Sequence, residues 1–342
     1  MTVATQLEFL DLRHFSAKQL RPLLEDEARV WKARLRWSYE SSSELLLQYL
    51  DSRILPGFVA LDRGRICGFT FSVHEGQKAV VGDAYSISTE TASAAQITER
   101  LLDHLLDLLL NSPDIERIES QMLLYDPGVI ERSFLEAGFS LYRRLFMEVD
   151  RPSVPVSVLQ NGKSAGLPEY LEIKGWTPAC YQQAGELIHA AYTNHVDASI
   201  NDQYRSLHGS LRFLHNIVRF PGCGVFDGAA SMVLRDTRTD TLAGMLLCSR
   251  VAPEVAHITQ ICVAEPYRRY GLGQATMNHF ISHLAANAYS AITLTVTESN
   301  QPAVSLYESL GFKVRHRFDA MVKDLSAKDT RLTPRGSLAP RG

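Results

Sequence analysis

Residues 265–276 place two arginines and two glycines in a short turn between an apolar run and an amphipathic pattern. The turn reads EPYRRYGLGQAT, and the apolar run before it ends at Val263. A strand, a turn and a helix in this order point the helix N-terminus, with its unpaired N–H groups, at the edge of a sheet. Glycines let an anion approach the main chain, and arginines match the geometry of phosphate. The segment therefore predicts a turn that binds a pyrophosphate.

Three other interpretations of this turn were compared with it. A dinucleotide fingerprint needs a third glycine, but Thr276 stands at that position, and the nearest acidic residue, Glu298, lies past the end of the next strand. A P-loop needs Gly-Lys-Ser/Thr, which does not follow. A plain surface turn with basic residues stays open, because short strings of this kind occur by chance.

The elements around the turn must hold it at a sheet edge. Residues 255–263 are expected to form a strand and residues 272–288 a helix, with apolar residues at helical spacing such as Met277, Phe280 and Leu284. Residues 291–297 alternate apolar residues with threonines, which is typical of a strand with two unlike faces. Near the chain start, Ser16 and Gln19 fit a capping box for a helix running to about residue 37.

The two halves of the chain repeat one order of elements. Strands are expected at 63–73, 79–87 and 115–124 with a helix at 96–110, and the second half has strands at 239–251 and 255–263. Gly68 precedes Gly244 by 176 residues, and Phe139 precedes Phe312 by 173. A nearly constant offset indicates a tandem duplication. Each α+β unit should contain an antiparallel meander, a helix, a strand, a helix and a last hairpin, forming a mixed, mostly antiparallel twisted sheet flanked by helices.

The expected boundaries follow composition. Residues 151–168 are rich in turn-forming residues and predict a linker between a domain at 1–150 and a domain at 169–326. Residues 327–342 end in Pro-Arg-Gly repeats and predict a disordered tail.

Composition excludes several classes of function. The net charge of −3 argues against non-specific binding of nucleic acid. No run approaches the roughly 18 apolar residues of a membrane span, and the first residues do not resemble a secretory signal. The five scattered cysteines form no CxxC pair, and the 11 histidines form no metal motif. We expect a cytoplasmic protein without a metal, a membrane partner or a nucleic-acid partner.

The succession of elements and motifs strongly resembles the GNAT superfamily of CoA-dependent N-acyltransferases. Residues 268–273 (RRYGLG) match its R/Q-x-x-G-x-G/A turn, and Asn300, Ala303, Tyr307 and Gly311-Phe312 match its second signature. The resemblance covers about 168–325 closely and 1–150 only in layout. It implies acetyl-CoA as co-substrate, with the pyrophosphate on the turn and the pantetheine along the fourth strand. The cofactor-binding residues that it implies are Ile261, Cys262, Val263, Arg268, Arg269, Tyr270, Gly271, Leu272, Gly273, Gln274, Asn300 and Tyr307.

Acetylation of an amine needs two proton transfers, one from the ammonium and one to the departing thiolate. Tyr307 stands at the family position of the acid, although a tyrosine there can simply cover an apolar face. His257 stands where the family often has its base, although a lone histidine at a strand start is more often structural; Glu265 or a water relay are the other candidates. Asn300 is implied in CoA binding, or it only caps a helix.

The first half keeps the scaffold but not these chemical positions. Its counterpart of the turn is 92–97 (ASAAQI), without glycine or arginine, while His257 maps to Val81 and Tyr307 to Phe134. We expect this half to keep the fold without acetyl-CoA catalysis, and to wall the acceptor site or bind a partner.

The family places the acceptor near residues 184–215, where Tyr192, His195 and Asp197 are the chosen candidates and His189, Asp202 and Tyr204 are further polar residues. The leading hypothesis is an N-acetyltransferase that acts on a small-molecule primary amine by direct attack in a ternary complex. A protein or peptide N-acetyltransferase and a non-catalytic acetyl-CoA sensor are the alternatives. The sequence leaves a monomer and a homodimer equally open.

Overall fold

The computed structural model describes residues 7–150, 167–220, 222, 224–268, 272–286 and 289–325. Most of the expected linker and the whole expected tail lie outside these residues. So do three residues of the glycine turn, Arg269, Tyr270 and Gly271.

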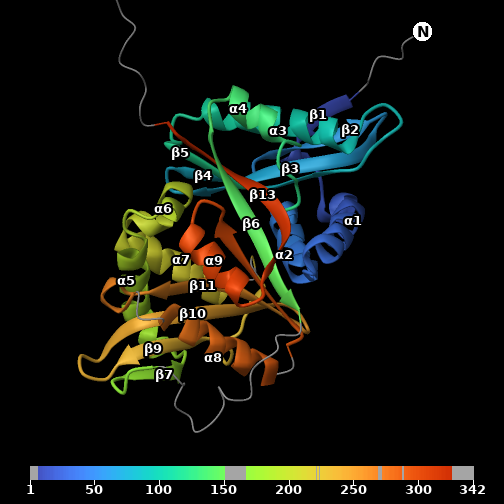
Figure 1. The fold of residues 1–342 in the computed structure, drawn as a ribbon. Helices are drawn as coiled ribbons and strands as arrows, with labels where there is room; N and C mark the ends of the chain where they lie inside the picture. The colour runs from blue at the N-terminus through green and yellow to red at the C-terminus, as the bar shows by residue number, and fades with distance from the viewer. Residues whose placement is uncertain are drawn as a thin grey trace, which may run out of the picture.

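Each half of the chain ends in the same succession of three strands, a helix, a strand, a helix and a long strand (Figure 1). The first half contains β1 Leu7–Asp11, α1 Ala17–Leu35, α2 Glu40–Asp51, β2 Gly57–Asp62, β3 Arg65–Glu75, β4 Lys78–Ser86, α3 Ala94–Leu110, β5 Arg117–Gln121, α4 Glu131–Glu136 and β6 Ser140–Asp150. The second contains β7 Leu171–Gly175, α5 Tyr181–Tyr192, α6 Val196–Ile200, α7 Leu207–Arg219, β8 Val225–Phe226, β9 Met232–Asp236, β10 Thr241–Ala252, β11 Val255–Val263, α8 Leu272–Ala286, β12 Ala291–Thr297, α9 Gln301–Ser309 and β13 Lys313–Asp324.

Several local predictions are confirmed. The strands expected at 255–263 and 291–297 are β11 and β12 with the same bounds. The capping box of Ser16 and Gln19 starts α1, which ends at Leu35 because Arg36 takes a left-handed conformation. These elements could be predicted because their signals are local: alternation for the strands, and paired side-chain hydrogen bonds for the helix start.

A single sheet runs through both halves, in the order β1-β2-β3-β4-β5-β13-β6-β12-β11-β10-β9-β7, with β8 beside β10. The last strand of each half crosses into the other: β13 lies between β5 and β6, and β6 lies between β13 and β12. Figure 1 shows β6 in green and β13 in red, side by side across the middle of the molecule. The pairing is antiparallel except for the parallel pairs β4–β5 and β11–β12.

The expectation that each half closes with its own hairpin is wrong, because the last strands of the two halves are exchanged. Each half has one long strand after its last helix, and this strand does not pair with the preceding strand of its own half, β5 or β12. The two long strands cover the edges of β5 and β12 reciprocally and in equivalent registers, because Asp150 pairs with Ala291 and Asp324 pairs with Arg117. Sequence periodicity predicts a strand but not its partner, so the exchange could not be foreseen.

Helices cover both faces of this sheet. In the first half, α3 and α4 pack on one face, while α1 and α2 build a separate core on the other. In the second half, α8 and α9 share a core with β6, β11 and β12, and α5 and α7 cover the opposite face. The core under α1 also takes in Val251, Val255 and Ala291 from the second half, so the two halves share buried apolar surface.

Candidate active site

The parallel strands β11 and β12 part from one another halfway along. They pair from Val255 with Ala291 to Ile258 with Leu294, and no further. A bulge at Thr259 follows at once on the β10 side, and from there the residues of β11 alternate between half-buried and buried. The half-buried residues include Ile261 and Val263. Their main chain therefore has no β12 partner, and we call this place, where the β11–β12 pairing ends, the slot.

The N-terminus of α8 stands next to this slot in the chain. A short turn of 3-10 helix, Glu265–Tyr267, leads from β11 toward Leu272, the first residue of α8. Leu272 is buried, Gly273 is half-buried and Gln274 is exposed. A Cβ added to Gly273 would meet only Leu306, at an ordinary 3.6 Å. Internal packing therefore does not require this glycine, whereas close approach of an anion to the helix start would.

Arg268 is held by main-chain carbonyls on two elements. Its Nε donates to the Val263 carbonyl at 3.0 Å, and its Nη2 donates to the Ala191 carbonyl at 2.9 Å. The exposed guanidinium thus ties the end of β11 to the end of α5. Its other N–H groups remain for an anion, so Arg268 fits the phosphate role while also closing the base of the slot.

Tyr307 lies on α9, buried against Phe312 at a ring-centroid distance of 5.9 Å. Burial, and then the charge of Asp197, raise the pKa of Tyr307 above its usual value. The phenol is therefore protonated across the physiological range, which is the state that an acid needs. α9 follows the end of β12, so the resemblance and the fold place Tyr307 at the same edge as the slot.

His257 is buried among aromatic side chains. Its ring packs 5.0 Å from the Trp37 ring and 5.9 Å from the Phe146 ring, and its Nδ1 lies 2.9 Å from Thr293 Oγ1. Burial lowers the pKa of His257 to about 3. The sequence could not show this, because both aromatic neighbours come from the first half. The geometry supports a packing role for His257, and the base must be sought elsewhere.

The side chains expected at the acceptor site cluster at the end of α5. Tyr192 donates to the Ile261 carbonyl at 3.4 Å, so it reaches the unpaired part of β11. Its ring stacks on Tyr204 at 4.1 Å and meets the His195 ring edge-on at 5.1 Å. Tyr204 continues inward to Gln260 Oε1 at 3.3 Å. This aromatic cluster forms one wall of the slot.

His195 and Asp197 form a second group that touches β12 and α9. The main-chain N–H of Asp197 donates to His195 Nδ1 at 3.2 Å, and His195 Nε2 lies 3.2 Å from the Asn300 side-chain amide. Asp197 Oδ1 accepts a hydrogen bond from Thr297 Oγ1. Asn300 precedes α9, but its side chain makes no capping hydrogen bond there. The capping interpretation is therefore not supported, and Asn300 faces the acceptor residues.

A pocket of about 510 Å³ opens beside this cluster. It is lined by His189, Tyr192, Thr193, Asn194, His195, Val196, Ala198, Ser199, Tyr204 and Arg205. Tyr192 and His195 were predicted as acceptor residues, and both line it; Asp197 does not. Its size is within the usual range for small-molecule sites. We call residues 195–205, which supply much of the lining, the acceptor segment.

Sequence reasoning missed Arg144, which reaches this group from β6 in the first half. Its Nη1 lies 3.4 Å from Asp197 Oδ1 and 3.2 Å from Thr297 Oγ1, and its Nη2 lies 3.4 Å from Thr295 Oγ1. Its side chain is only 11% exposed. The only signal in the sequence is an arginine in the middle of a strand, which says nothing about the residues that it meets.

The corresponding slot of the first half is filled. Strands β4 and β5 also part after Val81 and Ser120, but the Tyr125 hydroxyl donates to the Ala84 carbonyl at 2.9 Å and lies 3.2 Å from Thr98 Oγ1. The strand pairing corrects one alignment made from the sequence. The bulge of β4 and the bulge of β11 lie 177 residues apart, so His257 corresponds to Val80 rather than to Val81.

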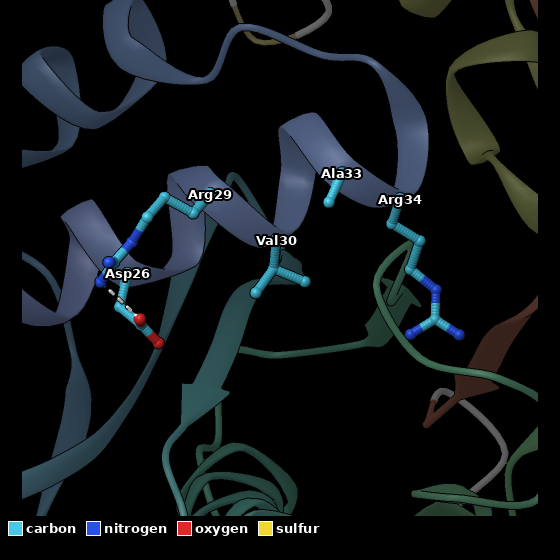
Figure 2. Close-up of a pocket in the computed structure, with 5 residues that line it drawn as sticks. All are labelled: Asp26, Arg29, Val30, Ala33 and Arg34. Atoms are coloured by element: carbon cyan, nitrogen blue, oxygen red, sulfur yellow. Dashed lines mark hydrogen bonds and ion pairs between the residues drawn. The ribbon is translucent and has the colours of Figure 1, made fainter.

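The helix start that would hold a pyrophosphate is also occupied in the first half. Ser93 and Gln96 form a capping box at α3, which satisfies N–H groups there. A shallow groove of about 590 Å³ lies along α1, lined by Asp26, Arg29, Val30, Ala33 and Arg34 (Figure 2). Its charged groups are paired within the protein, as in the 2.6 Å ion pair of Arg29 with Asp26. These contacts support the expectation that this half keeps the fold without binding acetyl-CoA.

Other chemistries find little support among the residues that the structure describes. Cys67, Cys180, Cys248 and Cys262 are buried and unbridged, and burial raises the pKa of Cys262 to about 12. A thiolate nucleophile is therefore not available beside the slot. The described residues contain no group of three side chains that could hold a metal ion. Nor does any described helix have the length and apolar character needed to cross a membrane.

Comparison with known proteins agrees with this geometry. Residues 198–312 match the model of the acetyltransferase (GNAT) family. The ribosomal protein bS18-alanine N-acetyltransferase of Escherichia coli strain K12 is 39% identical over 64 residues, which are 19% of this chain and 43% of the relative. The chain thus spans less than half the length of this curated relative.

Two solved structures share the fold over nearly the whole chain. A GCN5-related N-acetyltransferase from Sphaerobacter thermophilus gives a TM-score of 0.60 at 15% identity, over 93% of this chain and 96% of that chain. A tandem GNAT protein from the clavulanic acid biosynthesis pathway gives a TM-score of 0.56 at 14% identity, over 94% of this chain and 99% of that chain. The mixed α+β fold of the two halves is therefore shared with both structures, one of which is a tandem protein.

Proposed function

We propose that the second half of the chain, in which residues 198–312 match the model of the acetyltransferase (GNAT) family, transfers an acetyl group from acetyl-CoA to the primary amine of a small molecule. The observation that carries the proposal is the parting of β11 and β12 beside the start of α8, with the acceptor pocket next to it. One edge of the sheet thus offers a place for a thioester, a place for its phosphates and a place for an amine.

Acetyl-CoA would supply the thioester carbonyl that the amine attacks. The side of the Ile261 to Val263 main chain that β12 does not pair would hold the pantetheine, and the start of α8 with Arg268 would hold the pyrophosphate. The residues Cys262, Leu272, Gly273 and Gln274 stand along the same path. Arg269, Tyr270 and Gly271 keep their proposed part in the turn on the sequence motif alone.

We propose Tyr307 as the acid that protonates the departing thiolate. Its raised pKa keeps the phenol protonated, and no described hydrogen bond of the protein engages its hydroxyl. Loss of a positioned acid or base typically costs about 10²–10⁴ in rate.

His195 is the better candidate for the base than His257. It lines the acceptor pocket, and its side chain is 29% exposed, so an ammonium or a water can reach it. The Asp197 carboxylate lies 3.8 Å from its Nδ1, so a negative charge stands beside the ring. His257 is buried out of reach of solvent, and burial lowers its pKa to about 3.

A peptide N-terminus is the second candidate acceptor. It is favoured by the bS18-alanine N-acetyltransferase that part of the chain resembles. A peptide needs an open groove, whereas the pocket described here is lined by a single short stretch of chain. The size and the local lining of the pocket therefore favour a small amine.

The decisive experiment measures CoA release from acetyl-CoA with a panel of amines, amino acids, aminoglycosides and short peptides. Tyr307→Phe should lower kcat by about 10²-fold or more, because it removes only the donated proton. Tyr181→Phe is the matched control: that phenol donates to the Leu211 carbonyl at 2.9 Å, on the outer helices. Calorimetry should show unchanged binding of acetyl-CoA to both variants.

The outcomes separate the three hypotheses. Turnover with small amines supports the proposal, and turnover with peptides alone supports the second candidate. Binding of acetyl-CoA without CoA release above hydrolysis would favour the sensor hypothesis. Full activity of Tyr307→Phe would remove Tyr307 from the role of acid.

A further inference from the structure

The acceptor segment 195–205 is bound to the first half of the chain at several points. Asp202 accepts from Lys78 Nζ at 2.7 Å, and its main-chain N–H donates to Glu119 Oε1 at 2.9 Å. Arg117 Nη2 donates to the Ser199 carbonyl at 2.7 Å. In Figure 1, α6 of this segment lies between α5 and the strands β4 and β5.

The charges that make these contacts are buried. The side chains of Lys78, Arg117 and Glu119 are 5%, 6% and 8% exposed. Glu119 joins the two cations, at 3.3 Å from Lys78 and 2.6 Å from Arg117. Because buried charges are costly without partners, the carboxylate and carbonyls of the acceptor segment add to the pairing of this cluster and are held by it.

Apolar packing fixes the middle of the same segment. Ile200 is 1% exposed and shares a small core with Ala320, Val322 and Tyr142. Tyr142 comes from β6, and the other two come from β13, the strand that lies between β5 and β6. The segment is therefore anchored on the two exchanged strands as well as on β4 and β5.

Arg144 fixes the N-terminal end of the segment. It lies within hydrogen-bond distance of Asp197 and Thr297 and so links β6, β12 and the segment. Asp197 in turn donates its main-chain N–H to His195. Each end of the acceptor segment is thus held by residues of the half that lacks the slot.

We propose that the first half determines acceptor binding: Arg144 and the cluster of Lys78, Arg117 and Glu119 are positioning residues that hold the acceptor segment in its binding conformation. The expected effect on KM for the amine rests on the proposed function. The expected effect on the conformation of the acceptor segment does not. It explains why a half with a filled slot keeps buried charges that face the other half.

The test compares Arg144→Met and Asp202→Ala with the control Arg143→Met. Arg143 is the adjacent residue of β6, and its ion pair with Asp319 at 2.6 Å does not involve the segment. Asp202→Ala leaves Lys78 paired with Glu119 and with Glu75 at 3.2 Å, so the buried cation keeps partners. Hydrogen–deuterium exchange on the full-length free protein is the first readout, and it requires no acceptor.

We expect amides of 195–205 to exchange at least about tenfold faster in Arg144→Met and Asp202→Ala, with α8 unchanged. Arg143→Met should leave the segment protected, and Arg144→Lys should restore part of the protection. With any panel amine that the wild type acetylates, KM for the amine should rise about tenfold, while KM for acetyl-CoA changes less than twofold.

Unchanged exchange of the segment, or equal loosening in Arg143→Met, would overturn the inference. So would a rise in KM for acetyl-CoA equal to that for the amine. If no panel amine is acetylated, the proposed function fails, while the exchange data still decide whether the first half holds the segment.

Discussion

At the scale of single residues, two histidines near the slot stand in opposite surroundings. His195 is partly exposed in the acceptor pocket with Asp197 beside it. His257 is sealed between Trp37 and Phe146, and burial lowers its pKa to about 3. A group with such a pKa stays neutral from about pH 5 upward and cannot produce a limb of the activity profile near pH 6–7.

The two histidines should therefore respond differently to substitution. His195→Gln should lower kcat/KM by about 10²-fold or more, with acetyl-CoA binding kept. His257→Gln should leave the shape of the profile unchanged, although it weakens packing. Kinetics of CoA release between pH 5.5 and 9 measure both. Full activity of His195→Gln together with a large loss of activity in His257→Gln would reverse the assignment.

At the scale of elements, the bulges of β4 and β11 carry different residues at matching positions. Asp83 follows the bulge residue of β4, and Gln260 follows that of β11. Asp83 is buried with Glu27 of α1, which accepts from Trp31 Nε1 at 2.9 Å. Burial, and then the charge of Asp83, raise the pKa of Glu27 well above its usual value.

This buried pair should make the stability of the protein depend on pH. The pKa of Glu27 is raised in the folded state, so protonated Glu27 contributes to the stability of the fold. This stabilisation is fully present below pH 4–5 and is lost as the pH rises toward the raised pKa. Glu27→Gln keeps an acceptor for Trp31 but removes the ionisation. We expect the free energy of unfolding of Glu27→Gln, relative to the wild type, to be higher at pH 8 than at pH 5.

Denaturant unfolding at the two pH values measures this difference. Glu44→Gln is the control, because this exposed residue of α2 pairs with Arg21 on the surface of the same helix pair. An equal pH dependence in Glu27→Gln and the wild type would show that Glu27 is not the titrating group.

Elements were the part of the fold that the sequence predicted well, for a physical reason. Alternating threonines define β12, and a capping box defines the start of α1; both are signals within a few residues. Tyr307 and the glycine turn were also proposed from local signals, each through the spacing within its own motif. Arg144 escaped prediction because its role depends on contacts with residues 53 and 153 positions away.

At the scale of the whole molecule, the exchange of β6 and β13 joins the halves into one sheet. β13 pairs with β5 from Ala320 to Asp324, and β6 pairs with β12 from Arg144 to Asp150. Neither half can unfold without breaking strand pairs of the other. The protein should therefore unfold as one cooperative unit rather than as two domains.

A core substitution in the first half tests this cooperativity. Leu105 of α3 is fully buried, and Leu105→Ala should cost roughly 2–5 kcal/mol. Scanning calorimetry should show one transition that moves to lower temperature without splitting. Leu108→Ala on the same helix is the control, because Leu108 is 41% exposed. Two transitions, of which only one moves, would contradict a shared folding unit.

The sequence by itself determined the fold class, the duplication, the positions of most elements and the family signature, because each is written in local periodicity or in one motif. The tertiary structure decided which histidine is accessible, which strands pair and which half holds the acceptor segment. These properties arise from contacts between residues far apart in the chain, and no short pattern specifies such contacts. The glycine turn in the second half marks the proposed CoA site, whereas residues of the first half contact the proposed acceptor segment.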